Sequence, residues 1–228
     1  MFHIFKSFFN ISLSLQSYSD SSLIHQPVSA QNLFKIHRFS NFAEIMITAS
    51  AKKRENIAEY LLYMWQIEDL IRAYGLDIDR IQHEIIDRYE GLSDTQRRDM
   101  RDWYESLIDM MRREGVAEHG HLQLNKNTLA DLERLHRQLL ADPKFSAYSN
   151  QYYATLPLIV ELRSKAGDNK KDEIETLFEA MYGLLMLRIQ HKPVSDDTLA
   201  ASKQISKFLA LLATYYKKDY NNELFNQD

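Results

Sequence analysis

The chain has 228 residues, of which six are glycine, four are proline and none is cysteine, while 26% are charged. Average proteins contain about 7% glycine and about 5% proline, so this deficit excludes collagen-like and disulfide-scaffold proteins and argues against an all-β fold with many tight turns. The formal net charge of −4 argues against nucleic acid as a partner, because nucleic-acid-binding proteins carry basic patches that neutralise phosphates.

Residues 1–45 differ in composition from the rest of the chain. They contain five of the 60 charged residues (28 basic and 32 acidic) but seven of the 11 phenylalanines, and they show no helical periodicity. Three interpretations stay open: a misassigned start with the true start at Met46, a disordered or docking tail, and an export signal. We expect residues 1–45 to be a non-globular extension and residues 46–228 to form a single helical domain.

Three helices are predicted in the first half of the remaining chain. The first covers residues 52–74, where apolar residues recur every three or four positions, and it ends at Gly75, a residue type that suits a helix C-terminus. A second, shorter helix covers residues 78–89. The third begins after Ser93, which together with Gln96 matches a capping box.

Four more helices follow a long interruption. They are expected to begin near Asn127 as the N-cap, to cover about residues 146–165 and 172–190, and to follow the cap residue Ser195. Pro157 removes a backbone donor, so it must kink the fifth helix or mark its first turn. The sixth helix is apolar nearly all round, which predicts a central helix or half of an interface. We therefore predict an all-α fold, a compact bundle of about seven mostly antiparallel helices, preceded by a disordered or spurious N-terminal segment.

Four of these helices each place one ionisable side chain on or beside an apolar face. At about 100° per residue, Glu68, His136 and Arg163 fall within apolar stripes, and Arg188 lies at the edge of one. Buried charges are costly unless paired, so one interpretation is structural pairing of Glu68 with Arg163 or Arg188. Glu68 and Arg72 also match an i,i+4 surface pair. The alternative is a polar interhelical pocket that binds a small anionic ligand through the arginines, or in which Glu68 or His136 is catalytic.

Motifs for metal binding and catalysis are sparse. Glu133 and His136 match one Glu-x-x-His element, whereas a di-iron site needs two such elements and two further carboxylates. His119 and His121 lie in a predicted loop without partners at ligand spacing. The chain has no glycine-rich phosphate loop, no nucleophile elbow and no cysteine nucleophile. We therefore expect no metal, no cofactor and no catalytic residue.

Four segments together resemble a known family. They are EYLLYMWQIEDLIR at 59–72, WYESLIDMMRREG at 103–115, GHLQLNKN at 120–127 and LPLIVELR at 156–163. The resemblance covers about residues 50–217 and is to an uncharacterised bacterial all-helical family, domain of unknown function 4924. It implies a start near Met46 and a bacterial, cytoplasmic setting, and it carries over no functional residue.

The sequence thus favours a non-enzymatic helical bundle that acts as a protein-interaction module, with a protein partner or a second copy in a homodimer. No uncharged apolar run approaches the ~18 residues that cross a bilayer, so we expect neither a membrane nor nucleic acid as a partner. The alternative is a small anionic-ligand-binding or enzymatic bundle whose pocket contains Glu68, His136, Arg163 and Arg188.

Overall fold

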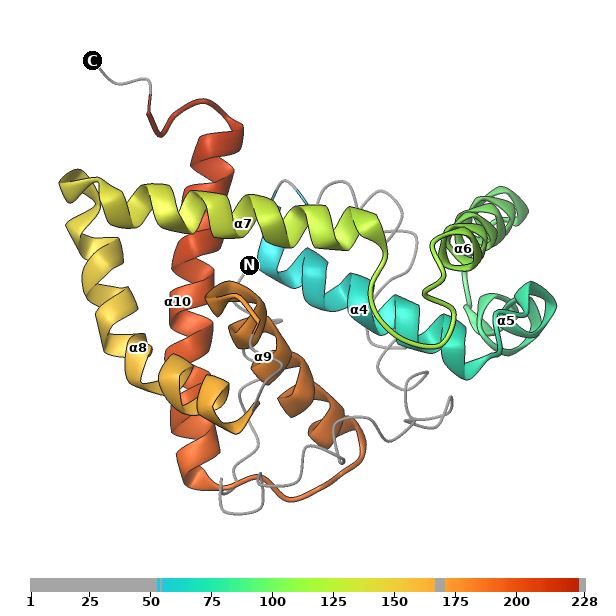
Figure 1. Ribbon diagram of the computed structural model, residues 1–228. Helices are drawn as coiled ribbons and strands as arrows, with labels where there is room; N and C mark the ends of the chain where they lie inside the picture. The colour runs from blue at the N-terminus through green and yellow to red at the C-terminus, as the bar shows by residue number, and fades with distance from the viewer. Residues whose placement is uncertain (1–52, 54, 167–170, 226–228) are drawn as a thin grey trace. The chain divides into compact units, whose positions relative to one another are not determined.

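All regular secondary structure in the described part of the chain is helical. The computed structural model describes residues 53, 55–166 and 171–225, so the N-terminal extension expected at residues 1–45 lies outside the described residues. The described residues form seven α-helices and two short 3-10 helices, without a β-strand (Figure 1). The prediction of an all-α fold with about seven helices is confirmed.

The described residues group into two compact units. The N-terminal unit contains those up to Thr128, and the C-terminal unit contains those from Leu129 onward. The boundary falls inside helix α7 (Gln123–Ala141). The single domain expected for residues 46–228 stays a prediction.

The N-terminal unit consists of α4 (Ile57–Ala73), α5 (Ile78–Glu84), the 3-10 helix η3 (Ile86–Arg88), α6 (Asp94–Arg113) and the first residues of α7. Local signals set most of these boundaries. Gly75 follows α4 with φ +70°, as a C-terminal glycine should. The predicted capping box at the start of α6 is present, with Ser93 Oγ accepting from Gln96 N and Gln96 Oε1 accepting from Ser93 N.

The start of α7 was predicted at the wrong residue. The helix begins at Gln123, before the expected N-cap Asn127. Its first backbone donors are satisfied by carboxylates from distant positions: Glu114 accepts from Gln123 N at 2.6 Å, and Glu68 accepts from Leu122 N at 2.9 Å. A local sequence pattern does not contain such partners, so Asn127 was mistaken for the cap although it lies inside the helix.

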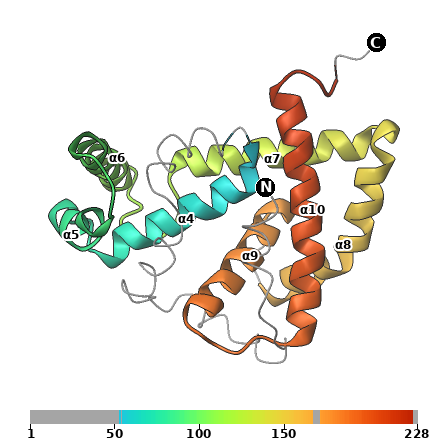
Figure 2. The ribbon, with the colours of Figure 1, turned by 180° about the vertical axis from the view of Figure 1, so that it is seen from behind.

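The C-terminal unit contains the rest of α7, the 3-10 helix η4 (Pro143–Phe145), α8 (Ser146–Lys165), α9 (Glu173–Ile189) and α10 (Asp196–Tyr220). Helices α8, α9 and α10 pack against one another, and α10 runs back past α9 (Figures 1 and 2). Most of α9 is buried, so the sixth predicted helix is central within this unit. Pro157 lies in the interior of α8 and not in its first turn.

Large apolar side chains fill the core of each unit. In the N-terminal unit they include Leu61, Trp65, Ile67, Ile81 and Tyr104. In the C-terminal unit they include Leu132, Tyr148, Leu177, Phe178 and Phe208. None of the helices in the described ranges combines the length and the apolarity that crossing a membrane requires.

Candidate functional site

The structure distributes the four predicted site residues over both units. Glu68 belongs to the N-terminal unit, whereas His136, Arg163 and Arg188 belong to the C-terminal unit. Each group is therefore described with the partners it has in its own unit.

Glu68 is a fully buried carboxylate (0% exposed) on α4 with three hydrogen-bond partners. Its Oε2 lies 2.6 Å from His121 Nδ1, and its Oε1 accepts from Leu122 N at 2.9 Å and from Asn125 Nδ2 at 2.7 Å. Both carboxylate oxygens are thus engaged within the N-terminal unit. A buried carboxylate with this many donors is satisfied, which accounts for a charged residue on an apolar face.

Arg72 lies one turn after Glu68 on α4 and holds the same loop. Its guanidinium donates to the carbonyl oxygens of Val116, at 3.1 Å, and of Gly120, and it also pairs with Asp69. The interpretation of Glu68 and Arg72 as a surface pair is therefore wrong, because Glu68 is buried. The two side chains act together instead, and they fix the loop between α6 and α7 against α4.

His121 is oriented by this network. Its ring stacks on Trp65, with 4.2 Å between the ring centroids and 13° between the planes. The short contact of Nδ1 with Glu68 and the stacking on Trp65 fix the orientation of the imidazole ring. The sequence placed His121 in a loop, but it gave no signal that the residue binds Glu68.

In the C-terminal unit, His136 and Arg163 meet at the carboxylate of Glu173. His136 Nε2 lies 3.5 Å from Glu173 Oε2, and Arg163 Nη1 lies 3.7 Å from Glu173 Oε1. On its other side, His136 Nδ1 lies 2.7 Å from the Tyr148 hydroxyl. Burial lowers the pKa of His136, and the nearby Glu173 opposes this effect. Glu173 was missed in the sequence because an acidic residue in the first turn of a helix is common.

Glu133 on α7 is a buried carboxylate of the C-terminal unit. Its Oε1 accepts from Ile174 N at 2.6 Å, so a side chain of α7 caps the N-terminus of α9. Burial raises the pKa of Glu133 to about 7, although the hydrogen bond from the Ile174 backbone works in the opposite direction. The Glu-x-x-His element therefore has structural partners for both of its members. Across the described ranges, no group of three or more His, Asp or Glu side chains is arranged to hold a metal ion.

Arg188 lies near the end of α9, half-buried. Burial lowers the pKa of its guanidinium. Within the described residues, its buried Nε has no hydrogen-bond partner. The structure thus brings together two of the four predicted residues, His136 and Arg163, through Glu173.

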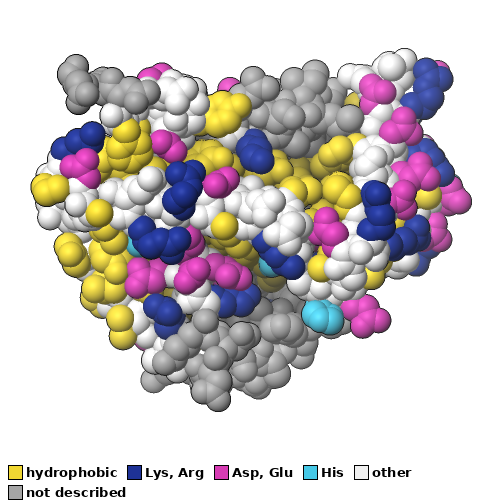
Figure 3. All heavy atoms as spheres, turned by 45° about the horizontal axis from the view of Figure 1, so that its top comes forward, with side chains coloured by type: hydrophobic (Ala, Val, Ile, Leu, Met, Phe, Trp, Pro, Cys, Tyr) yellow, Lys and Arg dark blue, Asp and Glu magenta, His cyan; other side chains and the backbone are white. Residues whose placement is uncertain are grey.

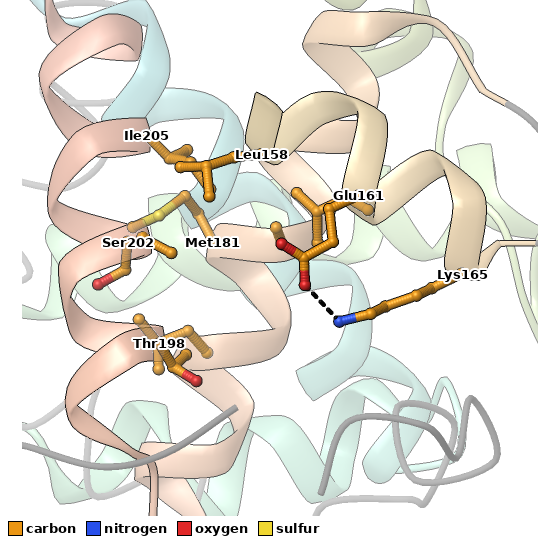
Figure 4. Close-up of a pocket in the computed structure, with 11 residues that line it drawn as sticks. Leu158, Glu161, Lys165, Met181, Thr198, Ser202 and Ile205 are labelled. Atoms are coloured by element: carbon orange, nitrogen blue, oxygen red, sulfur yellow. Dashed lines mark hydrogen bonds and ion pairs between the residues drawn. The ribbon is translucent and has the colours of Figure 1, made fainter. Parts of the chain in front are cut away.

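A small groove opens between α8, α9 and α10 (Figure 4). Its lining is mainly apolar and includes Leu158, Leu162, Met181, Leu184 and Ile205, with the ion pair of Lys165 and Glu161 also lining it. It holds about 60 Å³, whereas small-molecule pockets are commonly about 300–1,000 Å³. The groove therefore has room for one aliphatic side chain and not for a cofactor. None of the four predicted site residues lines it.

Helix α8 also exposes a face without charged residues, which we call the uncharged face of α8. Tyr153 is 64% exposed and Val160 is 60% exposed, the two largest values among the large hydrophobic residues of the described chain. At about 100° per residue, the face consists of Ser146, Ser149, Tyr153, Leu156, Pro157, Val160 and Ser164, of which Ser149 and Leu156 are half-buried. The buried residues of α8, Tyr148, Tyr152, Thr155 and Ile159, are centred about 120° around the helix from this face. Figure 3 shows apolar side chains exposed on the side where α8 lies in Figure 1.

Comparison with known proteins places these features in a family. No solved structure matches the chain significantly. The family model described as Domain of unknown function (DUF4924) matches residues 46–223, a range that includes α4 to α10. The match covers well over half of the chain, and the chain therefore belongs to the DUF4924 family.

Proposed function

We propose that this protein is a non-enzymatic protein-interaction module that binds its partner through the uncharged face of α8. The supporting observation is the exposure of Tyr153 and Val160 on a face without charge, in a chain of which 26% is charged. Interface centres are depleted in charged residues and enriched in aromatic ones. The family resemblance leads us to include a bacterial cytoplasmic setting in this proposal.

The energetics of burial also support binding at this face. Full burial of a valine-sized or larger apolar side chain contributes about 1.5–3 kcal/mol. Tyr153 adds an aromatic ring with a hydroxyl, a combination that interfaces favour because one end is apolar and the other forms hydrogen bonds. A partner that covers the uncharged face of α8 thus buries Tyr153 and Val160 without burying a charge.

The second candidate is a bundle that binds a small anionic ligand, with or without enzymatic activity. It is favoured by the convergence of His136 and Arg163 on one carboxylate. Glu173 already occupies the place that the anion would take, so a ligand phosphate or carboxylate would have to displace it. The interaction module is the preferred proposal because Tyr153 and Val160 are exposed, whereas Glu173 already pairs with His136 and Arg163.

Site-specific crosslinking tests the interaction module. A benzophenone amino acid is introduced at Tyr153 of the full chain and irradiated in the cells that express it. The matched control is Tyr220 on α10, which is 59% exposed. We expect crosslinked products at position 153 in several-fold excess over position 220, since only position 153 lies in the proposed contact. Equal yields at the two positions would refute the proposal.

A further inference from the structure

We infer that the partner of the uncharged face of α8 is the same face of a second copy, packed antiparallel about a two-fold axis between Leu156 and Pro157. This inference rests on the proposed function and names its partner. In a two-fold contact, the same patch is used twice, so residue i facing residue j requires j to face i. A face suited to such a contact must therefore place apolar side chains against apolar ones, and polar against polar, when one copy is reversed.

Six residues of the uncharged face meet this requirement. Ser149 and Ser164, Tyr153 and Val160, and Leu156 and Pro157 form three pairs whose numbers each sum to 313. Antiparallel packing about the centre of the face therefore sets serine against serine at both ends. It sets the ring of Tyr153 against Val160 twice, with Leu156 and Pro157 in the middle. Small residues at the ends allow the helices to approach to the usual distance of about 8–10 Å.

The charge distribution of α8 favours the antiparallel arrangement. The charged residues of this helix are Glu161, Arg163 and Lys165, all in its C-terminal part, whereas its N-terminal half contains none. In a parallel pair, each of these charges would lie beside its own copy, and like charges across an interface are unfavourable. In the antiparallel pair they lie beside the uncharged N-terminal half of the partner helix. The uncharged face of α8 is thus compatible with the same face of a second copy in the antiparallel direction.

The area of the uncharged face determines how stable the dimer should be. One helix face supplies an interface at or below the low end of the ~1,200–2,000 Å² that stable complexes bury. We therefore expect a dimer that dissociates on dilution and not a permanent one. Monomers and dimers would coexist at moderate concentration.

Disulfide mapping tests the register, because the chain contains no cysteine that would interfere. Two full-length variants with tags of different mass, Tyr153→Cys and Val160→Cys, are mixed and oxidised. In the inferred register these positions face each other. In this register, two copies of the same position lie seven residues apart, or about 10 Å along the helix axis. A disulfide needs Cα atoms within about 7 Å, so self-disulfides should be disfavoured. The control mixture pairs Val160→Cys with Tyr220→Cys.

The expected result is a mixed disulfide between the tagged chains in at least several-fold excess over both self-disulfides and over the control mixture. Two results would overturn the inference: self-disulfides of Val160→Cys as abundant as the mixed product, or no mixed product above the control. If the mapping fails while the benzophenone at Tyr153 crosslinks to a different protein, the self-pairing is wrong and the interaction module stands. If neither experiment gives a product above its Tyr220 control, both fail.

Discussion

At the scale of single residues, the buried carboxylate of Glu68 determines how the loop between α6 and α7 is held. The sequence places Glu68 on an apolar face through its helical spacing, and the structure shows it buried. Its partners His121, Leu122 and Asn125 lie more than 50 positions away along the chain. Helical periodicity identifies which side of a helix faces the core, but it contains no information about which distant group will meet that side.

Removal of this carboxylate should destabilise the protein strongly. Glu68→Ala leaves the Leu122 N–H and the Asn125 amide without their acceptor, and breaking a buried ionic network costs about 3–5 kcal/mol. Glu68→Gln keeps one acceptor oxygen, so its effect should be smaller. The free energy of unfolding in urea measures both effects. Glu105→Ala, which removes an exposed glutamate from α6, is the control and should change stability by less than about 0.5 kcal/mol. A Glu68→Ala protein as stable as this control would contradict the role of Glu68.

At the scale of secondary structure elements, the sequence predicts helix boundaries well where the capping groups are local. The capping box at Ser93 and the bounds of α8 agree with the prediction. Helix α7 begins earlier than expected because Glu68 and Glu114 satisfy its first donors. Helix α9 likewise is capped by Glu133 from α7, whereas its N-cap residue Asp172 forms no side-chain cap hydrogen bond. Tertiary capping of this kind is invisible to local pattern reasoning.

The cap of α9 makes stability depend on pH. The folded pKa of Glu133 is about 7, above its ordinary value of 4.5, so the protonated carboxyl is favoured in the folded state. Its contribution to stability is therefore complete below pH 4.5 and is lost as the pH rises through 7. Glu133→Gln keeps an acceptor for Ile174 N without a charge. We expect this variant to be more stable than the wild type by about 1–3 kcal/mol at pH 8, with the difference shrinking toward pH 5.

Thermal unfolding of both proteins between pH 5 and pH 8 measures this difference. Glu105→Gln, at an exposed position on α6, serves as the control and should follow the wild type over the whole range. A Glu133→Gln protein whose stability runs parallel to that of the wild type would show that Glu133 does not titrate in this range.

At the scale of the whole molecule, the composition identified the fold class, and the placement of charge supports the proposed interaction surface. Few glycines and prolines indicated an all-α chain, and the seven helices confirm this. The sequence also indicated apolar helices without showing which of their faces are exposed. Helix α9, apolar nearly all round, is buried in the C-terminal unit, whereas Tyr153 and Val160 of α8 are exposed. Only the packing of the other helices determines that α9 is buried while Tyr153 and Val160 of α8 are exposed.

The mass of the protein in solution, measured by light scattering over a concentration series, tests the central claim most directly. The chain has a mass of 26.9 kDa. We predict that the average mass of the wild type and of the control Tyr220→Asp rises toward twice this value at high concentration, because burial of Tyr153 drives the pairing. Tyr153→Asp, which places a charge in the centre of the contact, should stay monomeric. A wild type that remains monomeric throughout, or a Tyr153→Asp variant that associates as strongly as the wild type, would contradict this account.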